Sequence, residues 1–414
     1  MKRAFRITPA AALRRVLLAL AFAGLSVPGK AVPPESTKIL NHFLALSDIA
    51  AKALVPEPPD RESYRKNPGM RDYYMFFVDS YAVRALTVAY DLTGRERYWD
   101  ACRTWSDRMV RHQEKMIPRG AYYMNYHRKP GESQGQWYVA DSGSIAMAVL
   151  ATAARSKDPA LRKRYTDSVR SYLRLVADKF VRASGGVTDG YFDKSDKEWW
   201  CSTALYAAAA LQFHGLTGEA EFRRLGLNAV NWLLKFQYAD TVDLYKFEDG
   251  APTTIFYVLE AYSSALPYLE PGSERQRGVA RKFSQTVEWI AYTQTRKGTW
   301  DYSPDNWGVK LGGLPSQMLI YLSRVCDDAA KRRVCISSSG VETPFEKFVG
   351  ASAERALDYF ASLPINPSSF TQGDAFVMLS EAERLCPGEL YQKGKLPFPY
   401  RRYTEPELPA AGKP

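Results

Sequence analysis

The sequence has little of the chemistry that builds metal centres. Its 414 residues include five cysteines and four histidines, with no C-x-x-C pair and no histidine spacing typical of metal ligands. We therefore expect no metal site and no cofactor. In an exported chain, Cys326 and Cys335 are placed to close a short loop, and the odd cysteine count leaves at least one thiol unpaired.

A strongly basic surface is also missing. The formal net charge is +11, but six of the basic residues and no acidic residue lie in residues 1–31, so the rest of the chain carries +5. No basic run with interleaved aromatic residues is present, which argues against nucleic-acid binding. The mild positive charge is compatible with an acidic oligosaccharide or polysaccharide as the binding partner.

The chain lacks an apolar run long enough to span a bilayer comfortably. Its longest early run, Val16–Val27, follows five basic residues and precedes the small residues Gly29 and Ala31. This order predicts a signal peptide over residues 1–31, with an uncleaved inner-membrane tether as the alternative. We therefore expect a periplasmic or secreted protein without stable membrane insertion after cleavage.

A repeating helical hairpin dominates the remaining sequence. Each repeat has a polar outer helix, a connecting loop and an inner helix of small residues, with a period of about sixty residues. The periodicity predicts outer helices near 38–54, 97–113, 159–182, 219–236, 275–294 and 344–362. It predicts inner helices near 71–93, 141–154, 200–216, 253–266, 315–326 and 371–386.

The difference between the two helix types predicts two concentric layers. A helix that is apolar on most faces must be covered on most faces, whereas a helix with a charged stripe belongs at the surface. Twelve alternating helices that close on themselves form an (α/α)6 barrel, so the expected fold class is all-α. We assign residues 32–390 to this barrel and residues 391–414 to a C-terminal tail. An open α-solenoid is the alternative.

The connections predict a functional end. Turns from inner to outer helices are brief, whereas the opposite loops are long and rich in aromatic residues, and all long loops gather where the inner helices begin. The six helix N-termini there favour anions. Sugar rings lie on aromatic faces, and although core packing is the more common role of any single tryptophan, their clustering in the loops favours sugar binding. The residues expected to bind substrate are Tyr126, His127, Trp137, Trp199, Trp200, Trp300 and Trp307.

Two carboxylates are the candidate catalytic groups. Glycosidic hydrolysis needs one carboxylic acid to protonate the leaving oxygen and one carboxylate to activate water or attack. Asp141 follows the aromatic loop and opens an alanine-rich helix, with an ordinary helix N-cap as its alternative role. Asp79 lies within an apolar helix near Arg84, so an internal salt bridge is the alternative there.

The loop around Tyr126 and His127 allows a different reaction. Lyases and epimerases of uronic acids remove the proton beside a carboxylate, with Tyr or His as the base and Asn, His or Arg neutralising the carboxylate. The segment Tyr122–Arg128 contains all these residue types. A short polar and aromatic loop also contains them by chance.

Two segments resemble the six-hairpin glycosidase superfamily, and within it the unsaturated glucuronyl and rhamnogalacturonyl hydrolases. The first is Gln136–Asp141 followed by a small-residue helix, and the second is Val78-Asp79 followed by Leu92-Thr93-Gly94 and Tyr98. The resemblance implies an (α/α)6 barrel in which Asp141 is the general acid and base and Asp79 is a second active-site acid. Ser80 stands where the family usually has a second acid, which leaves the substrate class open.

Three functions follow as expectations. The first is a glycoside hydrolase that removes a terminal, unsaturated uronyl or related residue from an acidic oligosaccharide. The second is a uronate lyase or epimerase. The third is a saccharide-binding protein without catalytic activity.

Overall fold

The computed structural model describes residues 34–56, 75–122, 137–189, 196–235, 252–300, 311–336 and 340–388. These residues belong to one compact unit that begins at Pro34. Helices dominate it, as predicted. None of the helices in the described ranges combines the length and the apolar composition that a membrane span requires.

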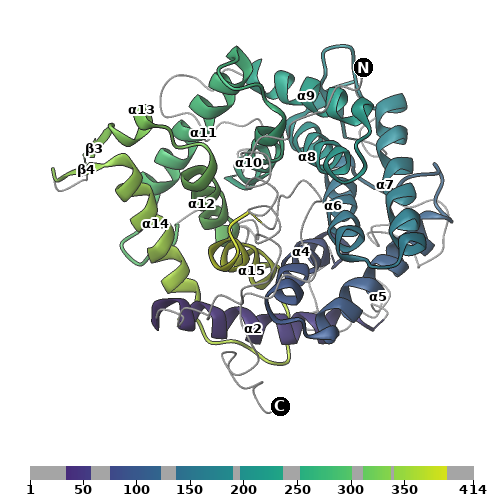
Figure 1. Cartoon of the computed structure of the whole chain (residues 1–414), viewed down its shortest axis with the longest axis horizontal. Helices are drawn as coiled ribbons and strands as arrows, with labels where there is room; N and C mark the ends of the chain where they lie inside the picture. Colours follow the sequence, from purple (N-terminus) through teal and green to yellow (C-terminus); the bar gives the residue numbers. More distant parts are fainter. Residues whose placement is uncertain are drawn as a thin grey trace, which may run out of the picture. The chain divides into compact units, whose positions relative to one another are not determined.

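Twelve long helices alternate between two concentric layers in the described ranges (Figure 1). The outer layer contains α2 (Pro34–Leu54), α5 (Glu96–Gln113), α7 (Pro159–Lys179), α9 (Ala220–Lys235), α11 (Glu274–Thr293) and α14 (Phe345–Phe360). The inner layer contains α4 (Met75–Thr93), α6 (Val139–Arg155), α8 (Trp200–Thr217), α10 (Pro252–Ala265), α12 (Leu314–Arg324) and α15 (Gln372–Leu385). Each helix lies within a few residues of its predicted position.

The inner layer is closed. Each inner helix packs against the next one along the chain, and the last, α15, packs against the first, α4. Outer helix α2 contacts both α15 and α4, so it covers the point of closure. The fold is therefore the predicted (α/α)6 barrel, and the open solenoid is excluded.

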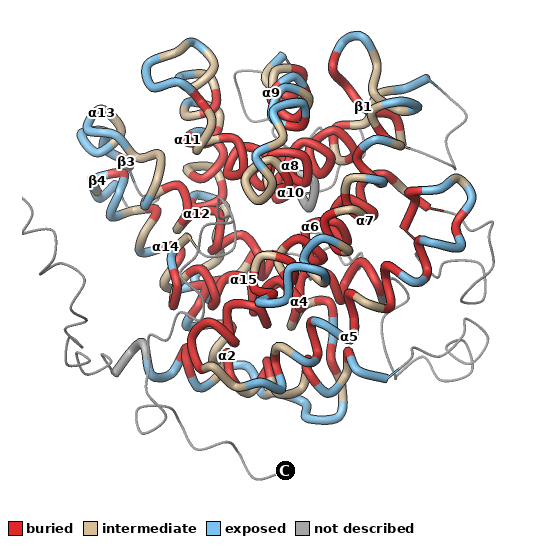
Figure 2. The backbone as a smooth tube through the Cα atoms, turned by 45° about the vertical axis from the view of Figure 1, so that its right-hand side comes forward, coloured by how far each residue is buried: buried red, intermediate tan, exposed pale blue. Residues whose placement is uncertain are grey.

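Small residues bring the inner helices close together. Ala207, Ala208, Ala209 and Ala210 form a fully buried turn of α8. On α6, a Cβ atom added to Gly143 would lie 3.0 Å from the carbonyl oxygen of Leu205 on α8, so the two backbones are almost in contact there. The tubes of the inner helices are accordingly buried along nearly their whole length (Figure 2).

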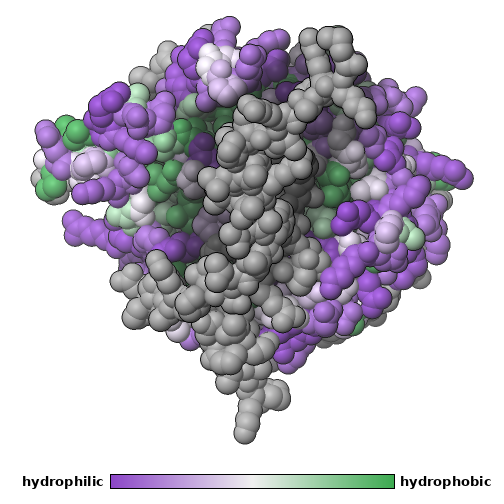
Figure 3. Space-filling view, in the orientation of Figure 1, coloured by the Kyte–Doolittle hydropathy of each residue, from purple (hydrophilic) through white to green (hydrophobic). Residues whose placement is uncertain are grey.

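Each outer helix has one buried face and one exposed face. On α5, Trp105 and Met109 are fully buried against the inner layer, whereas Arg103 and Arg111 are exposed. Hydrophilic residues occupy the rim of the ring, and hydrophobic residues appear between that rim and the centre (Figure 3). This amphipathic pattern is the one that the sequence periodicity predicts.

Connections from inner to outer helices are short, with one exception. Gly94 and Gly218 have positive φ angles, 67° and 79°, which let the chain reverse directly after α4 and α8. Between α12 and α14, however, the chain forms α13 (Asp328–Lys331) and an antiparallel pair, β3 (Val334–Ile336) and β4 (Glu342–Pro344). The expectation of uniformly brief turns at this end was wrong for that connection.

Two other connections also contain short secondary-structure elements. The loop between α7 and α8 carries a second antiparallel pair, β1 (Val187–Thr188) and β2 (Glu198–Trp199), in which Val187 faces Trp199. A short 3-10 helix, η2 (Leu266–Tyr268), follows α10. All five cysteines are free thiols, so Cys326 and Cys335 do not form the disulfide that their spacing allows.

Candidate functional site

The inner helices all begin at the same end of the barrel, which we call the mouth. Each inner helix follows an outer helix that runs the opposite way, so their N-termini gather there. On α15 a side-chain cap is formed at Thr371, whose hydroxyl accepts from the backbone N–H of Asp374 in a capping box. Helices α6 and α8 instead begin after Tyr138 and Trp199, without a side-chain cap.

Asp141 lies at the mouth as the third residue of α6, and it is partly exposed. The N-cap position belongs to Tyr138, so the alternative role of Asp141 as an ordinary N-cap is not realised. The helix start is held in place because the backbone N–H of Val139 donates to the carbonyl of Asp189 at 3.0 Å. The Tyr172 hydroxyl donates to the Val139 carbonyl at 2.8 Å.

Two tyrosines from other inner helices share the electrostatic environment of Asp141. Burial, followed by smaller contributions that include the negative charge of Asp141, raises the pKa of Tyr81 on α4 and of Tyr257 on α10 well above the usual value. Both phenols are therefore neutral at ordinary pH. They provide hydrogen-bonding groups close to Asp141 but no base, and the Tyr81 hydroxyl lies 3.0 Å from the Ser144 hydroxyl on α6.

An aromatic layer surrounds Tyr81 inside the ring. The Tyr81 ring lies 4.4 Å from that of Phe376 on α15, 5.2 Å from that of Phe77 and 6.0 Å from that of Phe256 on α10. The centre of the barrel is thus filled by rings from three inner helices. This layer was not predicted from the sequence, because its residues lie within the inner helices and not in the aromatic loops. The spacing of Phe77 and Tyr81, four residues apart on an apolar helix, was the available signal.

A buried ion pair lies about one helical turn deeper than this layer. Arg84 Nη2 on α4 donates to Glu260 Oε1 on α10 at 2.7 Å, and both side chains are almost completely buried. Helices α4 and α10 are three places apart in a ring of six, so the pair crosses the interior. The sequence placed Arg84 near Asp79 as a candidate for an internal salt bridge, and the structure joins Arg84 to Glu260.

Asp79 lies at the same end of the barrel as Asp141, on the neighbouring inner helix. Its side chain is 1% exposed, and its Oδ2 accepts a hydrogen bond from Trp105 Nε1 of outer helix α5 at 3.2 Å. The carboxylate is therefore bonded toward the outer layer. Asp141 is the more accessible of the two predicted acids.

The predicted sugar platforms are mostly packed into the protein. Trp137 is 1% exposed and meets Phe180 edge to face at 5.2 Å. Trp200 and Trp300 are also buried, and Trp300 Nε1 donates to the Ile290 carbonyl at 2.8 Å. These three rings offer no open face, because their apolar area stabilises the packing between helices.

Of the remaining predicted binding residues, only Trp199 lies within the described part of the chain. Trp199 is partly exposed, with Lys197 Nζ 4.5 Å from the centre of its ring. Tyr126, His127 and Trp307 lie outside the described residues. Within the part of the chain that the structure describes, no three histidine, cysteine or acidic side chains are grouped as metal ligands would be.

Comparison with known proteins finds similarity in structure only. No protein-family model and no curated protein sequence matches the chain. An unsaturated glucuronyl hydrolase from Bacillus sp. GL1, responsible for glycosaminoglycan degradation, superposes with a TM-score of 0.55 at 12% identity, over 87% of this chain and 98% of that one.

Two further solved structures have a similar fold. An α-1,6-mannanase of glycoside hydrolase family 76 from Salegentibacter gives a TM-score of 0.56 at 12% identity, covering 84% of this chain and 99% of that one. A possible member of family 105 from Salmonella enterica gives 0.52 at 13% identity, covering 87% and 96%. The chain therefore shares the (α/α)6 barrel fold of these solved structures.

Proposed function

We propose that this protein is a carbohydrate-active enzyme, and specifically a glycoside hydrolase that removes a terminal uronyl or related residue from an acidic oligosaccharide. The observation that carries the proposal is Asp141, a partly exposed carboxylate at the mouth of a closed helical ring, with neutral phenols and an aromatic layer beside it. The solved structures of similar fold include a glucuronyl hydrolase and a mannanase, which supports a saccharide substrate.

In this mechanism Asp141 moves the proton. Its protonated carboxyl group donates to the leaving glycosidic oxygen, and the bond from that oxygen to the sugar breaks. A second carboxylate takes a proton from the attacking water or forms a bond to the sugar. We propose Asp79 for this assisting role, and the hydrogen bond that its Oδ2 accepts from Trp105 Nε1 fixes the orientation of its carboxyl group.

The residues around Asp141 form the wall behind it. Tyr81 and Tyr257 are buried and remain protonated, so they support the position of α6 without taking part in proton transfer. The gathered N-termini of the inner helices favour a negatively charged substrate, because each helix end carries about half a positive charge. This field supports an acidic sugar over a neutral one.

Asp141→Asn tests the proposal. We expect turnover of an unsaturated uronyl oligosaccharide, followed by loss of its ultraviolet absorbance, to fall about a hundredfold or more while helicity stays unchanged. Asp178→Asn, on the exposed face of α7, is the matched control and should retain full turnover. Full turnover in Asp141→Asn would remove Asp141 from the mechanism.

The same assay separates the alternatives. A gain of ultraviolet absorbance with an intact uronate polymer would show a lyase, for which Tyr126 and His127 are the candidate residues. Tight binding of oligosaccharide without any product would show a binding protein.

We also propose that the protein is exported to the periplasm or the medium after removal of residues 1–31. The basic residues followed by a short apolar run support this proposal. Mass spectrometry of the mature N-terminus tests it. An N-terminus that retains Met1 in protein recovered from the cell membrane would favour the uncleaved tether.

A further inference from the structure

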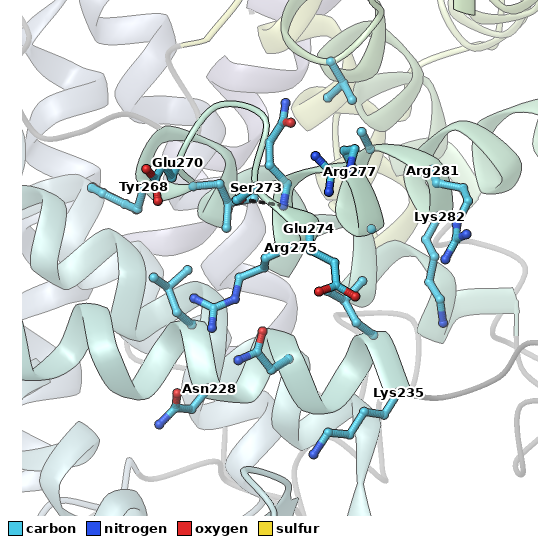
Figure 4. A pocket seen from close by; sticks show the side chains of 18 of the residues that line it. Asn228, Lys235, Tyr268, Glu270, Ser273, Glu274, Arg275, Arg277, Arg281 and Lys282 are labelled. Carbon is cyan, nitrogen blue, oxygen red and sulfur yellow. Dashed lines mark hydrogen bonds between the residues drawn. The ribbon is translucent and has the colours of Figure 1, made fainter.

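A large groove lies on the outer wall of the barrel, between outer helices α9 and α11. Its volume is about 1790 Å³. Figure 4 shows the two helices facing each other across it, with Asn228 and Lys235 on α9 and Arg275 and Lys282 on α11. The loop after α7, the connection from α10 to α11 and the segment around α13 also contribute residues to the lining.

The wall formed by α9 carries a polar stripe, and Leu225, Leu227 and Leu234 of the same helix also line the groove. Arg224, Asn228, Asn231 and Lys235 line the groove at intervals of four, three and four residues, which is the repeat of one helix face. At 1.5 Å per residue this face extends for about 16 Å. The side-chain amides of Asn228 and Asn231, which are able to hydrogen-bond to hydroxyl groups, therefore lie between the cations Arg224 and Lys235.

The opposite wall is more strongly basic. Arg275, Arg277, Arg281 and Lys282 of α11 line the groove, and only Glu274 of that helix opposes them. Where the two helices approach each other, Gly278 leaves room: a Cβ atom there would lie 3.5 Å from Leu234 Cδ1. The two walls thus converge on an apolar floor with cations above it.

The cations outnumber the acids that line the groove. Four of them are held by other groups: Arg182 pairs with Asp196 and Arg333 with Glu288, while Arg223 and Arg277 donate to backbone carbonyls. Four others make no hydrogen bond or ion pair to a described residue. These are Arg224, Lys235, Arg275 and Arg281.

This crowding is unfavourable for the free protein. Burial, together with the neighbouring charge of Arg281, lowers the pKa of Lys282 to about 8. A bound anion would relieve the repulsion, so the groove favours an anionic ligand.

We propose that the groove between α9 and α11 binds a segment of an anionic polysaccharide, outside the mouth of the barrel. The choice of a glycan rests on the proposed function and on the paired asparagines. Arg182 lies in the connection at the mouth end and Arg224 near the start of α9 at the far end, so the groove runs along the wall from the mouth. A long chain held at the mouth is placed to continue into it.

The test compares two triple charge reversals in the full-length protein. The groove variant is Arg224→Glu, Lys235→Glu and Arg281→Glu. The control variant is Lys52→Glu, Lys115→Glu and Lys347→Glu, which are exposed residues on other parts of the ring. Both variants change the net charge equally, and Lys52 and Lys235 both lie in the last turn of an outer helix.

Binding of polygalacturonate, measured by calorimetry, is the readout. We expect the groove variant to lose at least about tenfold in affinity and the control variant to lose less than about threefold. Turnover of a short uronyl substrate should stay unchanged in both. The affinity of the parent protein should fall as salt rises, and neutral mannan should not bind in the groove.

Three results would overturn the proposal. Equal losses in the two variants would show a response to net charge alone, and unchanged affinity in the groove variant would show that the groove does not bind. Duplex DNA that binds more tightly than polygalacturonate, and only when the groove is intact, would identify a nucleic acid as the ligand. Groove binding that persists in a protein without turnover would refute the proposed hydrolase while leaving this inference standing.

Discussion

The barrel interior and the outer groove place charges in opposite ways. Inside the ring, Arg84 meets Glu260 and Arg155 meets Asp91, each pair at 2.7 Å and almost completely buried. In the groove, nine lysines and arginines face three acids. The interior therefore neutralises its charges within the chain, whereas the groove leaves positive charge to be neutralised from outside.

The difference distinguishes charges that stabilise the fold from charges that are available to bind a ligand. A buried charge without a partner costs several kcal/mol, so interior ion pairs are needed simply to keep the fold intact. Solvent reaches the groove and lowers that cost, so four cations without a partner among the described residues persist there. Asp141 lies between these extremes, since it is partly exposed at the edge of the interior.

The largest expected effect on stability comes from breaking the pair that crosses the ring. Arg84→Met leaves Glu260 buried without its cation and should lower the free energy of unfolding by about 3–5 kcal/mol. Adding Glu260→Leu should recover most of the loss. Denaturant unfolding followed by circular dichroism measures both. A single variant as stable as the parent would show that the pair is not needed for the fold.

A smaller effect is expected where α6 touches α8. Gly143→Ala places a Cβ atom 3.0 Å from the Leu205 carbonyl oxygen and should cost about 1–3 kcal/mol, because the helices must separate slightly. It should also lower turnover, since Asp141 lies half a turn away on α6. Thermal unfolding and a turnover assay measure the two effects.

Gly350→Ala is the matched control for this substitution. Its Cβ atom would lie 3.7 Å from Leu322 Cδ1, an ordinary contact, so we expect a gain of about 0.5–1 kcal/mol from helix propensity. An equal change in the free energy of unfolding for Gly143→Ala and Gly350→Ala would contradict the close approach of α6 and α8.

The smallest effect is expected in the groove. Because the pKa of Lys282 is lowered to about 8, the folded state disfavours its charge, so Lys282→Met should stabilise the protein on the order of 1 kcal/mol at pH 7. The gain should be complete below pH 8 and fade as the pH rises toward the ordinary lysine pKa of 10.5, where the unfolded chain also loses its proton. Melting temperatures at pH 7 and pH 10 provide the measurement. A gain that does not change with pH would assign it to packing instead.

Much of the fold could be predicted from the sequence. The alternation of alanine-rich and amphipathic segments identified all twelve long helices and their layers, because helical periodicity is a local property of the chain. The hairpin β3–β4 was missed, since its strands of three residues are too short to show a pattern.

The candidate site was predicted less completely. Asp141 was predicted from its position at the start of a small-residue helix; the structure places it in the first turn of α6, and its catalytic role stays a prediction. The tryptophans were misjudged because the number of aromatic residues in a loop does not show which way they point: Trp137, Trp200 and Trp300 are buried. The ring around Tyr81 combines residues from α4, α10 and α15, which are far apart in the chain.

The sequence by itself determined the helices, their two layers and the end of the barrel at which the long loops gather, because these follow from periodicity and alternating direction. Only the tertiary structure decided that α15 closes the ring against α4, that Arg84 reaches Glu260, and that α9 and α11 leave a basic groove between them. The physical reason is that contacts between distant segments depend on how whole helices pack, and no local pattern records that packing.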